Sequence, residues 1–399
     1  MTKILVVATT FPSSSTDSQP RFVLDLCKAL DGKVEQRVIV PSAPGLSKTA
    51  TIDGIDVHRF RYSLKPLELL AYGGGILENL KSNFLKWLLI PFFFMGMIWE
   101  VKRQIKLFNP EIVHAHWWLP AGLASLIAIR LSPGECKLIL TCHGGDYFAL
   151  GHRFPSLMYW VFSKSDHVCM VSSAMMKDAT LNGVPERKLA VAPMGVDLQK
   201  KFSCDVSQVR QGVLFVGRLA EKKGIDVLLK AWSLLPDNIQ SQKLTIVGKG
   251  RKEGELRNLV RELNISNSII FEGSVSHNFL PDYYRRSRLL VFPSVISSDN
   301  DQEGLGLVPI EAIGCRCPVL ASRIEPLYDV IEDKRSGYFF EMANVDDLAL
   351  KMEWFFEQRQ SWIESNSDFA EISVRSKYDW NQVAANYNAI YSSALAQGV

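Results

Sequence analysis

The sequence predicts an α/β protein made of two doubly wound domains that face each other across a cleft. The chain has 399 residues, which is longer than one hydrophobic core usually serves. Apolar runs such as Ile4–Ala8 and Leu138–Thr141 are too continuous for a sheet with one solvated face, and they indicate parallel strands covered on both sides. These runs alternate with helical patterns, and the alternation begins again at Gly212, which predicts a second sheet of the same kind.

The first domain is expected to cover residues 1–198. It opens with a strand at Lys3–Ala8, a helix at Pro20–Leu30 and a strand at Arg37–Val40. Four later apolar runs predict further strands at Ile112–Ala115, Leu138–Thr141, His167–Val171 and Leu189–Ala192.

A polar stretch, residues 199–211, predicts a linker, and the second domain is expected over residues 212–377. Its predicted strands are Gly212–Val216, Lys243–Val247, Ile269–Phe271 and Leu289–Phe292, and its predicted helices are Ile225–Leu235, Glu253–Leu263 and Asn278–Ser287. Residues 378–399 form a helix with one apolar stripe, which must pack on a structure already built. In sheets of this kind, ligands bind outside the carboxyl ends of the strands.

Composition narrows the class of protein. Hydrophobic residues make up 47% of the chain and charged residues 22%, as in an ordinary globular protein, and a net charge of +3 is too small to indicate nucleic acid as a partner. The seven cysteines are an odd number, and Cys315-Arg316-Cys317 is not a zinc spacing, which favours core thiols in a reducing cytosol. Residues 1–12 make a poor signal peptide, so we expect a cytoplasmic protein.

One apolar segment, Trp87–Trp99, needs a separate prediction. As a helix it spans about 20 Å, which is short of the roughly 30 Å hydrocarbon core, and Pro91 interrupts it. We therefore expect it to lie in a membrane interface without spanning, on the inner face of the plasma membrane; a buried core helix is the alternative. The expected contacts with an anionic membrane surface are Trp87, Phe92, Phe93, Phe94 and Trp99, flanked by Lys81, Lys86, Lys102, Arg103 and Lys106.

The segment Glu303-Gly-Leu-Gly-Leu-Val-Pro-Ile-Glu311 carries two carboxylates eight positions apart. Gly304 and Gly306 let the backbone approach a ligand closely, and Pro309 suits the first turn of a helix. We expect Glu303 in a loop before that helix and Glu311 on its early turns. A helix N-terminus favours phosphate, and the carboxylates can accept hydrogen bonds from sugar hydroxyls. Two solvated acids at a helix start are the alternative.

The loop Val216-Gly-Arg-Leu-Ala-Glu-Lys-Lys-Gly224 follows one predicted strand and precedes a helix. Its guanidinium, Arg218, and its ammonium, Lys223, suit a diphosphate through bidentate and point-charge contacts. Lys222 is adjacent, so the sequence leaves open which lysine points inward. A solvated basic loop is the alternative.

Two strand ends of the first domain carry histidines. The run Thr141-Cys-His-Gly-Gly-Asp146 places His143 in a glycine-rich loop, where a histidine is more often functional than structural. His116 and Trp117 follow the preceding strand, and we interpret Trp117 as a cleft-wall or acceptor-side aromatic. Since no cysteine or carboxylate completes a ligand set beside the paired histidines, we expect no metal site.

A different motif argues against a dinucleotide-dependent enzyme. Gly248-Lys-Gly250, with Gly254 further on, follows a strand and opens a helix. The third glycine is displaced by one position from the dinucleotide fingerprint, and the first domain offers residues 9–15, Thr-Thr-Phe-Pro-Ser-Ser-Ser, where that fingerprint normally lies. An oxidoreductase is therefore not expected.

Together the motifs resemble the GT-B glycosyltransferases, specifically the large retaining family 4 (glycosyltransferase group 1) of the bacterial surface-polysaccharide type. The resemblance covers most of the chain and depends on the order and spacing of the motifs, since each alone is weak. They are HGGD at 143–146, APMGVD at 192–197, VGRLAEKKG at 216–224, VGKG at 247–250, FEGSVSH at 271–277, VFPS at 291–294, the glutamates of 303–311 and the final helix around Trp380–Tyr391.

The resemblance implies two Rossmann-like domains, with the acceptor side in the first, the nucleotide-sugar site in the second, and a terminal helix that crosses back to the first. Arg218 and Lys223 would hold the donor diphosphate, and Glu311 the ribose hydroxyls. Glu303 and His143, the expected catalytic residues, would contact the transferred sugar. The remaining expected site residues are Gly304, Leu305, Gly306 and Leu307, and further Asp146, Ser274, Val275, His277, Gly248, Arg21, His116 and Trp117. Family enzymes need no metal or other cofactor.

One loop departs from the family pattern. Many relatives carry a glycine pair after the first strand, where this chain has Phe11–Arg21 with serines, a threonine and Arg21 as the candidate donor contacts.

The expected reaction is metal-independent, retaining transfer of a sugar from a nucleotide sugar to a lipid-linked or membrane-proximal saccharide acceptor, in polysaccharide or glycolipid synthesis. The alternatives are a nucleotide-sugar epimerase or hydrolase of the same fold, and a non-catalytic, membrane-bound partner that binds nucleotide sugar. The base, the sugar, the acceptor and the oligomeric state leave no readable trace in the sequence.

Overall fold

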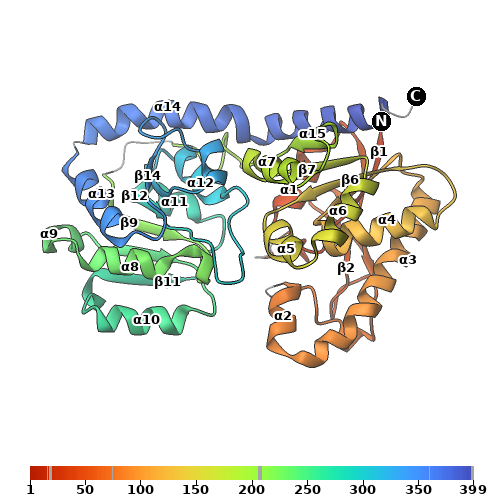
Figure 1. Ribbon diagram of the computed structural model, residues 1–399, viewed down its shortest axis with the longest axis horizontal. Helices are drawn as coiled ribbons and strands as arrows, with labels where there is room; N and C mark the ends of the chain where they lie inside the picture. Colours follow the sequence, from red (N-terminus) through yellow and green to blue (C-terminus); the bar gives the residue numbers. More distant parts are fainter. Residues whose placement is uncertain (16, 18–19, 74, 205–208, 359, 397–399) are drawn as a thin grey trace. The chain divides into compact units, whose positions relative to one another are not determined.

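The computed structural model describes the whole chain except residues 16, 18–19, 74, 205–208, 359 and 397–399, together with the side chains of 77–78 and 360–366. The described residues form two compact units (Figure 1): unit 1 is Met1–Gly195 with Val383–Val399, and unit 2 is Val196–Gln382. Each unit is built on its own parallel sheet, which confirms the predicted α/β class with two doubly wound domains. Residues 205–208 of the predicted linker lie outside the described part of the chain.

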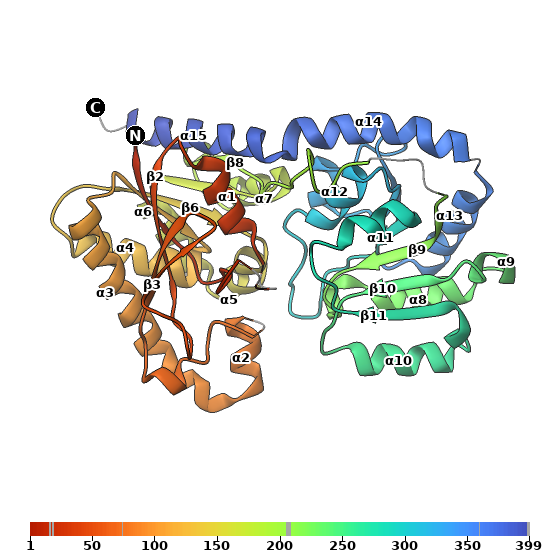
Figure 2. The same cartoon turned by 180° about the vertical axis from the view of Figure 1, so that it is seen from behind.

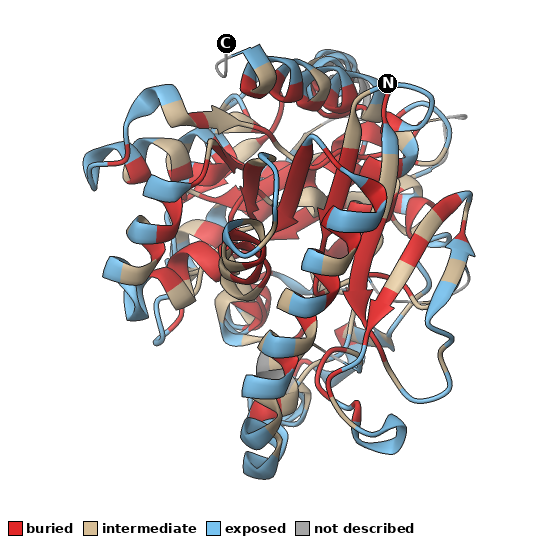
Figure 3. Ribbon diagram, turned by 90° about the vertical axis from the view of Figure 1, so that its right-hand side faces the viewer, coloured by how far each residue is buried: buried red, intermediate tan, exposed pale blue. Residues whose placement is uncertain are grey.

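Unit 1 contains an eight-stranded sheet in the order β3-β4-β2-β1-β5-β6-β7-β8. Its strands are β1 (Lys3–Val7), β2 (Glu35–Pro41), β3 (Thr49–Ile52), β4 (Ile55–Phe60), β5 (Ile112–His116), β6 (Lys137–Cys142), β7 (His167–Met170) and β8 (Leu189–Val191). Neighbouring strands are parallel except β3 and β4, which are antiparallel. The six strands predicted for this domain all form, within two residues of the expected bounds. In Figure 3 these strands are buried along most of their length.

The hairpin of β3 and β4 was not predicted, although its turn left a signal. Asp53 and Gly54 both have positive φ, 49° and 89°, and Asp-Gly is a preferred two-residue hairpin turn. The exposed side chains of the edge strand β3 break its apolar run, and periodicity alone therefore misses it.

Helices cover both faces of the unit 1 sheet. They are α1 (Phe22–Leu30), α2 (Ile76–Ser82), α3 (Ile90–Phe108), α4 (Leu123–Arg130), α5 (Gly151–Arg153), α6 (Pro155–Lys164), α7 (Ser173–Leu181) and the last helix, α15 (Trp380–Ala396). From Val383 onward, α15 belongs to unit 1 and lies beside α1 (Figure 2). It is held by Tyr387, whose hydroxyl donates to the Ala192 carbonyl at 3.0 Å, and by Tyr391, whose hydroxyl lies 2.9 Å from His114 Nδ1.

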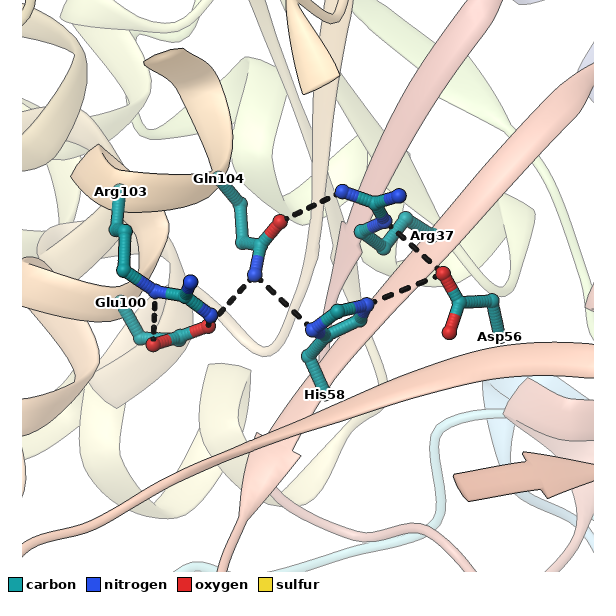
Figure 4. A network of polar contacts seen from close by, with 6 residues as sticks. All are labelled: Arg37, Asp56, His58, Glu100, Arg103 and Gln104. Atoms are coloured by element: carbon teal, nitrogen blue, oxygen red, sulfur yellow. Dashed lines mark hydrogen bonds and ion pairs between the residues drawn. The ribbon is translucent and has the colours of Figure 1, made fainter. Parts of the chain in front are cut away.

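A polar network joins the inner face of α3 to β2 and β4 (Figure 4). Gln104 is fully buried; its side-chain oxygen accepts from Arg37 at 2.9 Å, and its nitrogen donates to Glu100 at 2.7 Å. Arg37 also donates to Asp56 at 3.0 Å. Such a network stabilises α3 in one rotation about its axis, because turning the helix would leave these buried groups without partners.

The opposite side of α3, with the preceding 3-10 segment η2 (Phe84–Leu89), exposes a set of large apolar side chains. We call this set the apolar surface of α3: Phe84, Leu85, Trp87, Leu88, Phe92, Met95 and Trp99. Phe93 lies on the inner side instead, with its ring centroid 5.0 Å from those of Phe60 and Tyr62. The prediction that Phe93 contacts a membrane is therefore wrong, because each helical position turns about 100° from the last. Phe94 is half-buried.

Among the described residues, Phe84–Phe108 is the one helical stretch long and apolar enough to cross a membrane by length and composition. Its C-terminal half carries Glu100, Lys102, Arg103 and Lys106. Placing such charges near the middle of a bilayer costs about 2.5–3.5 kcal/mol each and would also break the network to the sheet. The structure therefore favours a helix that packs on unit 1.

Unit 2 contains a six-stranded, all-parallel sheet in the order β11-β10-β9-β12-β13-β14. The strands are β9 (Gln211–Val216), β10 (Leu244–Val247), β11 (Ile269–Gly273), β12 (Ser287–Phe292), β13 (Val319–Ser322) and β14 (Tyr338–Phe340). The helices are α8 (Ile225–Ser233), α9 (Asp237–Gln240), α10 (Glu253–Glu262), α11 (Leu280–Arg286), α12 (Leu307–Gly314), α13 (Val345–Glu357) and α14 (Gln360–Tyr378). All seven elements predicted here form within two residues of their expected bounds, whereas β13 and β14 were not predicted.

Helices α8 and α10 lie on one side of this sheet, and α11 and α12 lie on the other (Figure 1). The core on the α8 side is built around Trp232 and Phe215, both fully buried. Because both faces are covered, the loops at the carboxyl ends of the strands are the parts of the sheet left accessible to a ligand.

Candidate functional site

The charged motifs of unit 2 lie at the point where its strand order reverses. Strand β9 has β10 on one side and β12 on the other, so the loops after β9 and β12 leave the sheet in opposite directions. This reversal is where open α/β sheets bind nucleotides. The loop after β9 carries Arg218 and Lys223, and the loop after β12 carries Glu303.

The two loops pack directly on each other. The amide of Val295 donates to the Lys222 carbonyl at 2.8 Å, and the amide of Ser298 donates to Glu221 at 2.8 Å. Gly224 lies at the closest approach: it has φ of 59°, and a Cβ there would lie 1.9 Å from the Pro293 carbonyl oxygen. Glycine is therefore required at this position.

Gly224→Ala is expected to destabilise the protein by about 2–3 kcal/mol, because it adds left-handed strain to a backbone overlap. Gly254→Ala is the matched control. A Cβ on Gly254, in α10, meets nothing within 4 Å, and a change between zero and about 1 kcal/mol of added stability is expected. Urea unfolding measures both. Equal stability of the two variants would contradict the packing described above.

Lys223 and Glu303 form an ion pair at the centre of this site. Lys223 Nζ lies 2.7 Å from Glu303 Oε1, and both side chains are largely buried. Burial raises the pKa of Glu303, but the positive charges of Lys223 and Lys222 outweigh it, so the pKa of this carboxyl lies below its usual value. Lys222 pairs with Asp301 at 3.0 Å instead. The structure thus answers which lysine points inward: it is Lys223.

Two further groups at this edge are available to a ligand. The side chain of Arg218 is exposed, and its guanidinium makes no hydrogen bond or ion pair with any described residue. Helix α12 begins after Gly306, which has φ of 88°, and no side chain caps its first amides. A guanidinium and open helix amides at the same edge of a sheet are a favourable combination for phosphate. Gly304 and Leu305 lie in the loop directly before α12, and Leu307 is the first residue of the helix.

Glu311, on α12, already has a partner on each oxygen. His277 Nε2 lies 2.9 Å from Oε1, and the Tyr284 hydroxyl donates to Oε2 at 2.7 Å. His277 Nδ1 in turn lies 2.7 Å from Lys201 Nζ. A carboxylate has about four acceptor positions, so Glu311 keeps capacity for further hydroxyl groups.

Three other predicted contacts of unit 2 lie on neighbouring strand-end loops. Ser274 is exposed and Val275 half-buried in the loop after β11. Gly248, after β10, serves packing: a Cβ there would lie 1.8 Å from the Gly217 carbonyl oxygen. Its predicted role as a ligand contact has no support from this geometry.

In unit 1 the predicted residues gather at the ends of β5 and β6, beside the start of α1. The His143 ring is half-buried, with its centroid 4.8 Å from that of Trp117 and 5.0 Å from that of Phe22. Trp117 has a positive φ of 70° with ψ of 124°, a backbone conformation that is rare for a bulky residue and concentrates at functional sites. His116 is completely buried, with Nδ1 3.0 Å from His143 Nε2.

Two predicted ligand contacts of unit 1 are engaged within the protein. The buried carboxylate of Asp146 accepts from the backbone amides of His143 at 2.7 Å and Trp118 at 3.0 Å, so it shapes the loop. Burial raises the pKa of Asp146 to about 6. Arg21 forms an ion pair with Asp53 at 2.5 Å, whereas we expected it to contact the donor from the loop after β1. Residues 16 and 18–19 of that loop lie outside the described residues.

Sequence reasoning missed Tyr284 and the bond between His116 and His143. Tyr284 lies on α11 without any motif around it, and only the packing of α11 on α12 brings it to Glu311. The histidines did leave a signal, since both stand at the ends of strands that prove to be neighbours.

Comparison with known proteins agrees with this architecture. The sequence model of Glycosyltransferase Family 4 matches residues 19–200, and that of Glycosyl transferases group 1 matches residues 205–373. An uncharacterized glycosyltransferase of Methanocaldococcus jannaschii is 23% identical over 376 residues, covering 88% of this chain and 87% of the relative. The amylovoran biosynthesis glycosyltransferase AmsK of Erwinia amylovora is 24% identical, covering 62% of each chain.

The fold is also that of a solved structure. HepE of Anabaena, in complex with UDP-glucose, superposes with a TM-score of 0.72 and 16% identity, covering 98% of this chain and 100% of that one. Fold and strand-end site define a GT-B glycosyltransferase. The two family matches span both units, and the chain belongs to the glycosyltransferases with a Family 4 domain followed by a group 1 domain.

Proposed function

We propose that this protein is a retaining, metal-independent glycosyltransferase that moves a sugar from a nucleotide sugar to a lipid-linked or membrane-proximal saccharide acceptor. The observation that carries the proposal is the gathering of Arg218, Lys223 and the open N-terminus of α12 at the switch point of unit 2. These groups suit a diphosphate, and Glu303 and Glu311 beside them suit hydroxyl groups.

In this mechanism Arg218, Lys223 and the α12 amides neutralise the leaving diphosphate, so that a metal ion is not needed for that purpose. The acceptor hydroxyl attacks the anomeric carbon on the face that the nucleotide leaves. The bond from the anomeric carbon to the phosphate oxygen breaks, the glycosidic bond forms, and the departing phosphate oxygen takes the hydroxyl proton. Glu303 and His143 contact the transferred sugar, and Glu311 holds the ribose.

A panel of nucleotide sugars tests the proposal. UDP-glucose, the ligand of HepE, comes first, and GDP- and ADP-sugars follow, with a thermal shift reporting donor binding. Transfer is then measured with the selected donor, a saccharide-lipid acceptor and EDTA, and NMR gives the anomeric configuration of the product. An inverted product rejects the retaining mechanism, and loss of activity in EDTA rejects metal independence. If free or epimerised sugar forms and no glycoside does, the protein is a nucleotide-sugar hydrolase or epimerase. If the donor binds but is not turned over, the protein is a non-catalytic partner.

We further propose that the apolar surface of α3 docks on an anionic membrane, at the inner face of the plasma membrane. Seven large apolar side chains are exposed side by side on η2 and α3. Cations flank them: Lys48 Nζ and the Arg103 guanidinium each lie 6.0 Å from the Trp99 ring centroid, and Lys81 is exposed near η2. Aromatic side chains with nearby basic groups suit the interface of an anionic bilayer. Such docking brings the enzyme to a lipid-linked acceptor.

Replacing Trp87, Leu88 and Phe92 together by serine is expected to lower vesicle binding at least about 10-fold, because partial burial of each side chain contributes about 1 kcal/mol or more. The measurement is co-sedimentation with vesicles that contain phosphatidylglycerol. The matched control replaces three exposed apolar residues of unit 2, Leu234, Leu350 and Ile372, by serine. Equal binding of both variants and the parent protein rejects the docking surface.

A further inference from the structure

The second histidine of the unit 1 site, His116, cannot reach a ligand itself. It is completely buried, on β5, and its ring lies edge to edge with that of His143, at a centroid distance of 5.2 Å and an interplanar angle of 23°. Its Nδ1 lies 3.0 Å from His143 Nε2, while its own Nε2 is buried without a hydrogen-bond partner among the described residues. The hydrogen bond to His143 is therefore the direct route by which the His116 side chain can affect a ligand.

Its surroundings keep His116 in place. The ring of His114 lies behind it at a centroid distance of 4.4 Å. His114 is itself held by the hydroxyls of Tyr391 at 2.9 Å and Thr141 at 2.8 Å. Burial lowers the pKa of His114 and His143 to about 3 and that of His116 well below its usual value, so all three rings are neutral at physiological pH.

Two neutral histidines that share one hydrogen bond must divide donor and acceptor between them. If His143 Nε2 donated to His116, the proton of His116 would sit on its buried Nε2, as an N–H group without an acceptor. If His116 Nδ1 donates instead, His116 Nε2 carries no proton and is a buried acceptor without a donor. Buried N–H groups without partners are the rarer of the two cases, which favours donation from His116.

We infer that His116 is a positioning residue that fixes the tautomer of His143. With Nε2 of His143 accepting from His116, its proton lies on Nδ1, and the half-buried ring presents a neutral N–H donor. The group opposite must then offer an acceptor oxygen. This inference rests on the proposed function, in which His143 contacts the transferred sugar and the opposite group is a sugar hydroxyl oxygen. His143 then acts as an orienting donor without giving up or taking a proton.

Three substitutions of His116 test the inference. The amide nitrogen of an asparagine can take the place of His116 Nδ1 as the hydrogen-bond donor. The amide of a glutamine lies one methylene further out, and a leucine has no donor. His116→Asn is expected to keep kcat within about 3-fold of the parent protein. His116→Gln and His116→Leu are expected to lower kcat about 10- to 50-fold, with the Kd for the nucleoside diphosphate alone changed less than 2-fold.

The comparison of asparagine with glutamine remains decisive if the leucine variant does not fold, since both are polar. Equal kcat for these two variants, at equal thermal stability, overturns the positioning role. A variant that loses affinity for the nucleotide as well as kcat also overturns the positioning role, because such a loss indicates general damage to the site.

A spectroscopic measurement addresses the tautomer itself. In the full-length protein labelled with ¹⁵N-histidine, long-range ¹H–¹⁵N correlation is expected to show His143 protonated on Nδ1 and His116 on Nδ1. Protonation of His143 on Nε2 overturns the inference. His143→Ala separates the two proposals: full activity of this variant contradicts the proposed role of His143, whereas an impaired His143→Ala with unimpaired His116→Leu contradicts the positioning role alone.

Discussion

Glu303→Gln is expected to lower kcat by about 10²–10³-fold, while the Kd for the nucleoside diphosphate changes less than about 5-fold. The substitution keeps the shape of the side chain but removes a charge that is nearly buried and paired with Lys223 at 2.7 Å. If this carboxylate contacts the transferred sugar, its contribution appears mainly in the transition state, where losing one preorganised group has an effect of this size. Initial-rate kinetics and calorimetry measure the two quantities.

Asp301→Asn is the matched control for Glu303→Gln. Asp301 lies on the same loop and forms the neighbouring ion pair, with Lys222 at 3.0 Å, but it is more exposed. We expect less than about a 3-fold change in kcat, since exposed ion pairs contribute about 0–1 kcal/mol. If the two variants lose activity to the same extent, the effect comes from the loop as a whole and Glu303 has no special role.

Arg218→Ala is expected to raise the Kd for the nucleotide sugar about 10- to 100-fold. Hydrogen bonds to a charged group contribute about 1.5–3 kcal/mol, and a guanidinium can hold a diphosphate through two of them. Stability should not change, because Arg218 has no side-chain partner among the described residues. For Arg218→Lys we expect a Kd for the nucleotide sugar between those of the parent protein and Arg218→Ala, since an ammonium keeps the charge and loses the bidentate geometry.

Arg251→Ala supplies the comparison for Arg218→Ala. Arg251 is another exposed arginine of unit 2, at the N-terminal side of α10 after β10. Calorimetric titration with the donor selected by the nucleotide-sugar panel is expected to give the parent affinity for this variant. An unchanged affinity for Arg218→Ala, in a protein that still binds the donor, means that the diphosphate lies elsewhere.

The strands and most of the helices for which the sequence predicted bounds form within two residues of those bounds, because their signals are local. Continuous apolar runs mark strands buried on both faces, and glycines with charged residues mark the strand ends. The site of unit 2 followed from the same signals, since loops after parallel strands of one sheet share an edge. Four strands were not predicted: β3, β4, β13 and β14. Length alone does not explain this, since three-residue β8 was predicted and six-residue β4 was not. Strand β3 was missed because exposed residues interrupt its apolar run.

The wrong predictions concern the direction in which a side chain points and the partner that it binds. Phe93 stands within an apolar aromatic run, and only the rotation of α3 set by the network around Gln104 shows that it faces inward. Arg21 and Asp146 looked available to a ligand, yet Asp53 and two backbone amides engage them. In each case the partner is distant in the sequence or belongs to the backbone, and neither leaves a pattern that can be read along the chain.

By itself, the sequence determined that this chain forms two doubly wound domains, and which of its loops carry charged and glycine-rich motifs. The tertiary structure decided which groups meet: Lys223 with Glu303, His277 and Tyr284 with Glu311, and His116 with His143. The physical reason is that periodicity and turn chemistry act between near neighbours in the chain. Hydrogen bonds and ion pairs at a site depend instead on strand order and helix rotation, which only the assembled core establishes.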